Sequence, residues 1–221
     1  MSGTAGIADW ARLFRIARSL IKQVNVNERI IDHWTFGGGT AIMLQIDHRE
    51  SHDVDLFLND AQLLPFLDPK NHDFAFEIVP SDYEGDGTSF IKMSFDGIGE
   101  IDFIVRQALT NAPTIEREIE GERTLLETIP EIITKKIVNR GAIIRPRDIF
   151  DLAAGAEQHA EAIVAALRHY PDAVNATLEK LNELNPEFVN RAIQALMIRD
   201  SFKAMSRSAI ERAKEILKSS L

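Results

Sequence analysis

Asp53 and Asp55 are carboxylates two residues apart, and they follow three consecutive glycines at 37–39 by about a dozen residues. Side chains two apart on a strand point to the same face, so both carboxylates can enter one site while Val54 and Leu56 enter the core. Two anions this close call for a cation beside them. The pattern therefore indicates a site for a divalent metal ion.

A third carboxylate comes from a strand farther along the chain. The alternation in residues 100–105 puts Ile101 and Phe103 on one face and Asp102 on the other. Carboxylate oxygens are the ligands that Mg²⁺ prefers, and two such ions about 3.5 to 4 Å apart can clamp both oxygens of an in-line phosphoryl displacement. We therefore predict one or two Mg²⁺ ions at Asp53, Asp55 and Asp102. A solvated strand edge beside an ordinary turn is the plain alternative.

The glycine turn has a chemical interpretation of its own. It lies at the start of an expected helix, so the backbone N–H groups of Gly38, Gly39 and Thr40 can face a nucleotide phosphate at the positive helix end. Without side chains at the glycines, a phosphate can approach the backbone closely. We therefore expect a nucleoside triphosphate to bind there.

A helix expected over 129–140 carries cations on its apolar face. At about 100° per residue, Lys136 and Arg140 fall within the arc of the isoleucines, whereas Lys135 points away and is expected to be solvated. A cation on an inward face requires an anion, so Lys136 and Arg140 are predicted to meet the carboxylates or a bound triphosphate. Snorkelling of both side chains at a lobe boundary is the alternative.

Two further groups have weaker functional interpretations. Asp148 and Asp151 share a flank of the next helix, where acidic residues commonly complement the helix dipole. His48 and His52 have the spacing of a metal-binding pair only on a helix, and they fall in an expected helix-to-strand turn. We therefore do not expect a histidine metal site there, and we interpret His33 and His72 as structural or surface residues.

Composition limits the classes of function. The chain has 221 residues, of which 45% are apolar, enough for a buried core, and its formal charge of −9 disfavours binding of nucleic acid over the whole surface. The absence of cysteine excludes disulfides and thiolate chemistry and fits a cytoplasmic protein. Charged residues interrupt the apolar pattern at 1–24, which favours an amphipathic helix there over a signal peptide or membrane span.

Periodicity predicts the elements that hold these residues. Strands are expected at 33–36, 53–58, 74–79, 89–95 and 100–105, with the last two forming a hairpin, and a helix is expected over 40–45. Beyond residue 128 the pattern is helical, with a capping box at Thr128, a C-terminal stop at Gly141, and helices over 129–140, 147–160, a stretch ending at 169–170, 172–184, 186–198 and 201–219. The predicted fold is α+β: a mixed-sheet lobe with flanking helices over 1–127, followed by a helical lobe over 128–221.

The chain resembles the AbiEii/AbiGii family of nucleotidyltransferase toxins over roughly residues 36–153, in four elements that occur in the same order. These elements are Gly37-Gly38-Gly39-Thr40-Ala41, His48-Arg49-x-Ser51-x-Asp53-x-Asp55-Leu56-Phe57, Lys135-Lys136-x3-Arg140 and Arg147-Asp148-x-x-Asp151-Leu152. The resemblance implies the nucleotidyltransferase fold and transfer of a nucleoside monophosphate from a nucleoside triphosphate, with release of pyrophosphate. In related toxins the acceptor is the 3′ end of tRNA and a neighbouring antitoxin protein opposes the toxin.

The resemblance also implies residue roles. Asp53 and Asp55 match the metal-binding pair, Asp102 is the expected third carboxylate, and Lys136 matches the basic residue of the third element. The nucleotide-binding set comprises Gly38, Gly39, Thr40, Ser51, Lys136 and Arg140. Asp151 is expected at the later acidic position, with Asp148 as its competitor.

Three functions stay open from the sequence. The first is a Mg²⁺-dependent toxin that transfers a nucleotide to RNA, for which basic side chains at 135–147 and 199–218 could contact the backbone. The second is a nucleotidyltransferase that modifies a small molecule or a protein hydroxyl. The third is a non-catalytic interaction module, which retention of all three carboxylates and Lys136 argues against. No membrane partner is expected.

Overall fold

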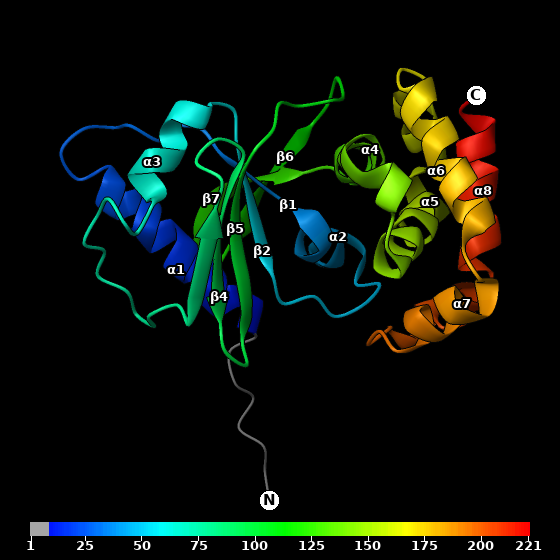
Figure 1. The fold of residues 1–221 in the computed structure, drawn as a ribbon, viewed down its shortest axis with the longest axis horizontal. Helices are drawn as coiled ribbons and strands as arrows, with labels where there is room; N and C mark the ends of the chain where they lie inside the picture. Colours follow the sequence, from blue (N-terminus) through cyan, green and yellow to red (C-terminus); the bar gives the residue numbers. More distant parts are fainter. Residues whose placement is uncertain (1–8) are drawn as a thin grey trace, which may run out of the picture. The chain divides into compact units, whose positions relative to one another are not determined.

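The computed structural model describes residues 9–221, which form two compact units (Figure 1). The first unit contains the described residues up to 40 together with 51–107 and 116–126, and the second contains 41–50, 108–115 and 127–221. The second unit thus includes two short segments that precede the expected boundary at 127/128. The division of the chain into lobes at 127/128 therefore stays a prediction.

Within residues 9–221, seven strands form one mixed sheet in the order β3-β4-β5-β2-β1-β7-β6. Strand β2 pairs with β5 in parallel and with β1 in antiparallel orientation, and β1 pairs with β7 in parallel. The strands are β1 (Thr35–Gly37), β2 (Val54–Leu58), β3 (Asp82–Gly85), β4 (Phe90–Phe95), β5 (Gly99–Val105), β6 (Thr114–Ile119) and β7 (Glu122–Glu127).

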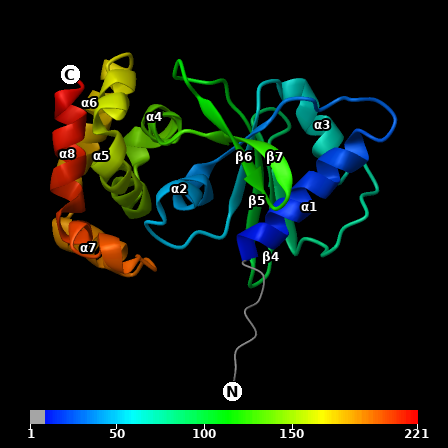
Figure 2. The same cartoon turned by 180° about the vertical axis from the view of Figure 1, so that it is seen from behind.

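One face of the central strands is packed under a helix. Val54, Leu56 and Leu58 of β2 are buried, as the alternation predicts, whereas Asp55 between them is only partly buried. The amphipathic helix α1 (Asp9–Val24) contacts β2 and β5 and lies across the sheet (Figure 2). Residues 1–8 of the expected N-terminal helix lie outside the described residues.

The strand predictions differ from the structure in one wrong strand, over 74–79, and in three strands that were not predicted, β3, β6 and β7. The β4–β5 hairpin is confirmed, but the strand expected over 74–79 is wrong: the amide and carbonyl of Ala75 bond to the side chain of Gln23 on α1 instead of to a neighbouring strand. The β6–β7 hairpin was not predicted. Its turn places Glu120 and Gly121 at φ 49° and 73°, the positive values that a tight hairpin requires.

Helices make up most of the second unit. Helix α5 packs against α4, α7 and α8, and α6 packs against α4 and α8. Proline at the first or second position begins four of these helices, where its missing N–H costs no hydrogen bond. The helices are α4 (Ile129–Arg140), α5 (Pro146–Leu167), α6 (Pro171–Glu183), α7 (Pro186–Gln194) and α8 (Ala209–Ser219).

Short elements complete the described chain. Helix α2 (Gly38–Ile46) begins in the first unit and continues into the second, and α3 (Leu64–Leu67) follows the 3₁₀ turn η1 (Ala61–Leu63) in the first. The second unit also contains the 3₁₀ turns η2 (Gly141–Ile143), η3 (Asp200–Phe202) and η4 (Met205–Ser208). Among residues 9–221, no helix combines the length and the apolar character needed to cross a membrane.

Helices α5 and α8 differ in their bounds from the sequence expectation and α7 ends earlier, at Gln194, whereas Gly141 is the C-cap of α4 as expected. The two helices expected between 147 and 170 are one helix, α5, with a kink at His159. The last helix begins at Ala209, because η3 and η4 occupy the start of the expected span. Gly141 ends α4 in a right-handed conformation (φ −57°), so a left-handed cap does not explain the glycine. A Cβ there would lie 1.9 Å from Oγ1 of Thr177 on α6, and this close packing requires glycine.

Candidate active site

The carboxylates of the first unit lie on neighbouring strands. Asp55 of β2 and Asp102 of β5 are register partners in the parallel pair, so their side chains share a face of the sheet. Their buried neighbours Leu56 and Phe103 point to the opposite face, which packs against α1. Asp53 immediately precedes β2 and lies two residues before Asp55 in the chain.

The glycine bend lies directly against Asp55. Gly38 has φ +70°, and a Cβ on it would lie 1.8 Å from Oδ2 of Asp55. Glycine is therefore needed both for the backbone conformation and for the approach of the carboxylate. Gly39 follows in the first turn of α2, and the buried Thr40 hydroxyl donates a hydrogen bond to the backbone carbonyl of Asp53. The bend thus brings the first turn of α2 to the acidic strand.

Asp53 has a different environment from the other two carboxylates. Its Oδ1 accepts a hydrogen bond of 3.1 Å from the amide of Glu100. Among residues 9–221, no three histidine, aspartate or glutamate side chains are gathered closely enough to hold a metal ion. Asp55 and Asp102 are register partners on neighbouring strands, whereas Asp53 precedes the strand. Ser51 is half-buried in the segment before β2.

Asp102 is under electrostatic strain. Burial, followed by repulsion from Asp55, raises the pKa of Asp102 to about 7, while Lys92 acts in the opposite direction. Nζ of Lys92 lies 2.7 Å from Oε2 of Glu100 and 3.8 Å from Oδ2 of Asp102. Lys92 was not identified from the sequence, although counting outward from the 96–99 turn pairs it with Asp102 in the hairpin.

These features fit a divalent cation. The donors are hard carboxylate oxygens, and a cation between Asp55 and Asp102 would relieve the repulsion that the structure leaves only partly balanced by Lys92. The glycine bend leaves room at Asp55 that a side chain would fill. Asp55 and Asp102 would hold the ion, with Asp53 as the third expected ligand.

Lys92→Met tests this electrostatic balance. Removing a positive charge near Asp102 should tighten binding of Mg²⁺ or Mn²⁺ to the nucleotide-free protein by about three- to tenfold, because Lys92 and the ion compete for the same negative potential. Isothermal titration measures the affinity. Lys22→Met, which removes an exposed lysine of α1, serves as the control and should leave it unchanged. An affinity unchanged from the wild type in the Lys92 variant would show that no cation site lies beside Asp102.

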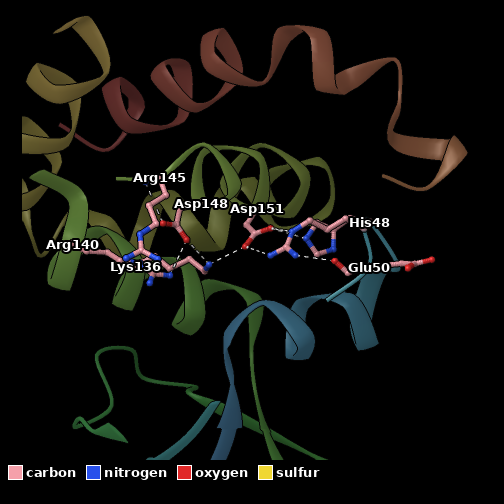
Figure 3. A network of polar contacts seen from close by, with 8 residues as sticks. His48, Glu50, Lys136, Arg140, Arg145, Asp148 and Asp151 are labelled. Carbon is pink, nitrogen blue, oxygen red and sulfur yellow. Dashed lines mark hydrogen bonds and ion pairs between the residues drawn. The ribbon is translucent and has the colours of Figure 1, made fainter. Parts of the chain in front are cut away.

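A second polar cluster lies within the second unit, between α4, α5 and the turn after α2 (Figure 3). Nζ of Lys136 lies 2.7 Å from Oδ1 of Asp148 and 2.8 Å from Oδ2 of Asp151. Arg140 also binds Asp148, at 2.8 Å. Arg49 binds both oxygens of Asp151, at 2.7 and 3.0 Å.

The carboxylates of this cluster are buried and ionised. Burial on its own would raise the pKa of Asp151, but Lys136 and Arg49 hold that pKa well below its usual range, with further hydrogen bonds from His48 and Arg49. Burial likewise opposes ionisation of Asp148, and Lys136 and Arg140 lower its pKa. The cluster is therefore a set of mutually dependent charges.

The structure changes the interpretation of several cations. Lys136 lies on a buried face, as expected, but its partners within the second unit are Asp148 and Asp151. The prediction that Lys135 is solvated is wrong: it is 5% exposed and bound to Glu127 at 2.6 Å. Glu131, one turn before Lys135, binds the amides of residues 109 and 110, so this second side of α4 is also covered.

Two members of the cluster, His48 and Arg49, bind Asp151 in contacts that were not predicted from the sequence. His48, where no metal site was expected, is fully buried, and its Nε2 lies 2.8 Å from Oδ1 of Asp151. Arg49 was named only as part of the motif that resembles the family. Both lie about a hundred residues from Asp151 along the chain, and no local spacing predicts such a contact.

Comparison with known proteins gives a family and a fold. The family model described as nucleotidyl transferase AbiEii toxin, type IV toxin–antitoxin system, matches residues 20–218. No curated protein matches the chain. Among solved structures, MenT4, a nucleotidyltransferase toxin from Mycobacterium tuberculosis, is 15% identical with a TM-score of 0.52, covering 96% of this chain and 86% of its own. A candidate nucleotidyltransferase from H. pylori is 17% identical with a TM-score of 0.50, covering 96% and 94%.

Proposed function

Because the chain belongs to the AbiEii family of nucleotidyltransferase toxins of type IV toxin–antitoxin systems, we propose that it transfers a nucleoside monophosphate from a nucleoside triphosphate to a hydroxyl of RNA, at the 3′ end of tRNA. The family implies a triphosphate substrate and an antitoxin counterpart. The proposal adds Mg²⁺ dependence and the RNA acceptor.

The observation that carries the proposal is the placement of Asp55 and Asp102 side by side, with Asp55 against Gly38. In the proposal, Asp55 and Asp102 hold one or two Mg²⁺ ions, and Asp53 completes the ligand set. When bound, Mg²⁺ would neutralise charge on the phosphates and fix the triphosphate for in-line attack. Asp102 is proposed either to bind a second Mg²⁺ ion or to accept the proton of the acceptor hydroxyl.

The backbone of the glycine bend receives the triphosphate. The N–H groups at Gly38, Gly39 and Thr40 belong to the first turn of α2, where they have no partners within the helix and the helix dipole is positive. The hydroxyl of Ser51 is proposed as a further hydrogen-bond donor to the nucleotide. The pairing of the Thr40 hydroxyl with the Asp53 carbonyl favours a backbone contact over a hydroxyl contact at Thr40.

Lys136 and Arg140 are proposed to stabilise the charge that develops on the leaving pyrophosphate. Asp151 is the proposed later acidic residue, because it is fully buried and four bonds from His48, Arg49 and Lys136 converge on its two oxygens. Asp148 shares Lys136 and remains its competitor. In this proposal the two aspartates hold the ammonium, and the ammonium contacts the phosphate.

The test is incubation of the purified protein with total RNA and each of the four nucleoside triphosphates, labelled at the α-phosphate, with Mg²⁺ or with EDTA. The expected result is label on a tRNA-sized band with one preferred nucleotide, none with EDTA, and none when the label is on the γ-phosphate, which leaves with pyrophosphate. Transfer to RNA should also fall steeply with added salt, because phosphate contacts release counterions. Labelling of protein or of a small molecule instead would refute the RNA acceptor but not the nucleotidyltransferase site.

A further inference from the structure

Within the second unit, Asp151 is the most heavily bonded carboxylate of the buried cluster. Its Oδ1 contacts Nε2 of His48 at 2.8 Å and Nε of Arg49 at 2.7 Å, and its Oδ2 contacts Nη2 of Arg49 at 3.0 Å and Nζ of Lys136 at 2.8 Å (Figure 3). The planar guanidinium of Arg49 thus spans both oxygens and fixes the plane of the carboxylate. A single ammonium group could not do this.

His48 also contacts Oδ1 of Asp151, and packing holds its imidazole ring in place. The imidazole is fully buried and stacks on Phe150, with ring centroids 5.7 Å apart and planes within 17°. Because Asp151 is ionised, Nε2 must carry the proton and donate to Oδ1. Asp151 is therefore held from two directions by residues of the turn after α2.

The position of Lys136 follows from that of Asp151. An ammonium group has three N–H donors, and Nζ of Lys136 uses two of them, on Asp148 and Asp151. No other acceptor within residues 9–221 bonds to this nitrogen. With two bonds fixed, the direction of the third N–H is also fixed. A lysine side chain otherwise has four rotatable bonds and would lose considerable entropy on binding a ligand.

We propose that Arg49 is a positioning residue: by locking both oxygens of Asp151, it holds Lys136 in one orientation, with the remaining N–H available as a donor to a phosphoryl oxygen of a bound triphosphate. His48 supports Arg49 in this role. This inference rests on the proposed function for the identity of the ligand, but the control of Lys136 by Arg49 can be measured without any ligand.

Arg49→Lys is the decisive variant, because it keeps the positive charge beside Asp151 and removes the two-oxygen contact. The KM for the triphosphate should rise by about tenfold, the loss expected for one misaligned charge-assisted hydrogen bond. A merely structural Arg49 would instead lower the active fraction, and so the apparent kcat, with KM unchanged.

Arg199→Gln is the matched control. Arg199 secures the same turn from its exposed side, with bonds of 2.9 Å to Asp47 and 3.0 Å to Glu50, and does not touch Asp151. Its loss should leave KM within about twofold of the wild-type value. An equal rise in KM for both variants would mean that loosening of the turn, not alignment of Asp151, causes the effect, and would overturn the proposal.

Acylation of lysines provides a readout independent of activity. Lys136 and Lys135 are both buried, but Lys135 is held by Glu127 at 2.6 Å and by Glu131 at 3.4 Å. Under brief treatment with an amine-reactive ester, Arg49→Lys should increase modification of Lys136 severalfold and leave Lys135 unchanged, as measured by peptide mass spectrometry. Unchanged Lys136, or an equal rise at both lysines, would refute the positioning role. A wild-type protein without transferase activity would refute the proposed function and leave this measurement intact.

Discussion

Asp55→Asn should abolish Mg²⁺-dependent nucleotide transfer, by at least about a thousandfold, without lowering the stability of the fold. The amide removes a metal ligand at the point where Gly38 and Asp102 converge. It keeps the size of the side chain, so packing against Gly38 is retained. It also removes an anion that repels a buried carboxylate. Transfer of α-labelled nucleotide and urea denaturation measure the two effects.

The pH dependence of stability provides a second readout for the same variant. Burial and Asp55 raise the pKa of Asp102 to about 7, so the folded protein binds a proton there more tightly than the unfolded chain does. This contribution favours folding at low pH and declines as pH rises from about 4 to about 7, after which it is constant. Asp55→Asn should lower the pKa of Asp102 and flatten this decline.

Asp96→Asn is the control for both measurements. Asp96 is exposed in the β4–β5 turn of the same unit, so activity and stability should stay close to the wild type. Full transferase activity in Asp55→Asn would rule out the acidic pair as the metal site. A large loss of stability would show instead that Asp55 has a structural role.

The sequence predicted what depends on short-range spacing. The family assignment is confirmed, because it rested on four motifs whose internal spacing is independent of the rest of the chain. The α+β fold class is likewise confirmed, since period-two alternation in 53–58 and helical spacing after 128 reflect which face of each element is buried. Alternation predicts that Asp102 lies on the opposite face from Ile101 and Phe103, but it does not predict the parallel pairing of β2 with β5 that brings Asp102 beside Asp55.

The sequence could not predict contacts that depend on long-range packing. A helical wheel assumes one buried arc, and Lys135 departs from it because two sides of α4 are covered. The pairing of Arg49 with Asp151 joins residues 102 positions apart, and no periodicity encodes their approach. The strand expected over 74–79 has the right alternation but lacks a neighbouring strand, since Gln23 takes the hydrogen bonds of Ala75.

Asp151→Asn should lower the free energy of unfolding by about 3 to 5 kcal/mol, the usual cost of removing one partner from a buried ion pair. The variant leaves Arg49 and Lys136 facing a neutral amide in a site where Asp151 has no exposure. Urea denaturation at neutral pH measures the loss. Asp200→Asn, which removes an exposed partner of Lys203, should change stability by less than about 0.5 kcal/mol.

The loss should itself depend on pH, with a sign that follows from the depressed carboxylate. Lys136 and Arg49 outweigh burial and hold the pKa of Asp151 well below its usual range, so the unfolded chain takes up the proton first as pH falls. The stabilisation is therefore complete above the ordinary aspartate pKa of about 4 and declines below it. The stability difference between wild type and Asp151→Asn should shrink as the pH falls below about 4. A difference that is constant across this range would mean that the ionised carboxylate does not stabilise the cluster.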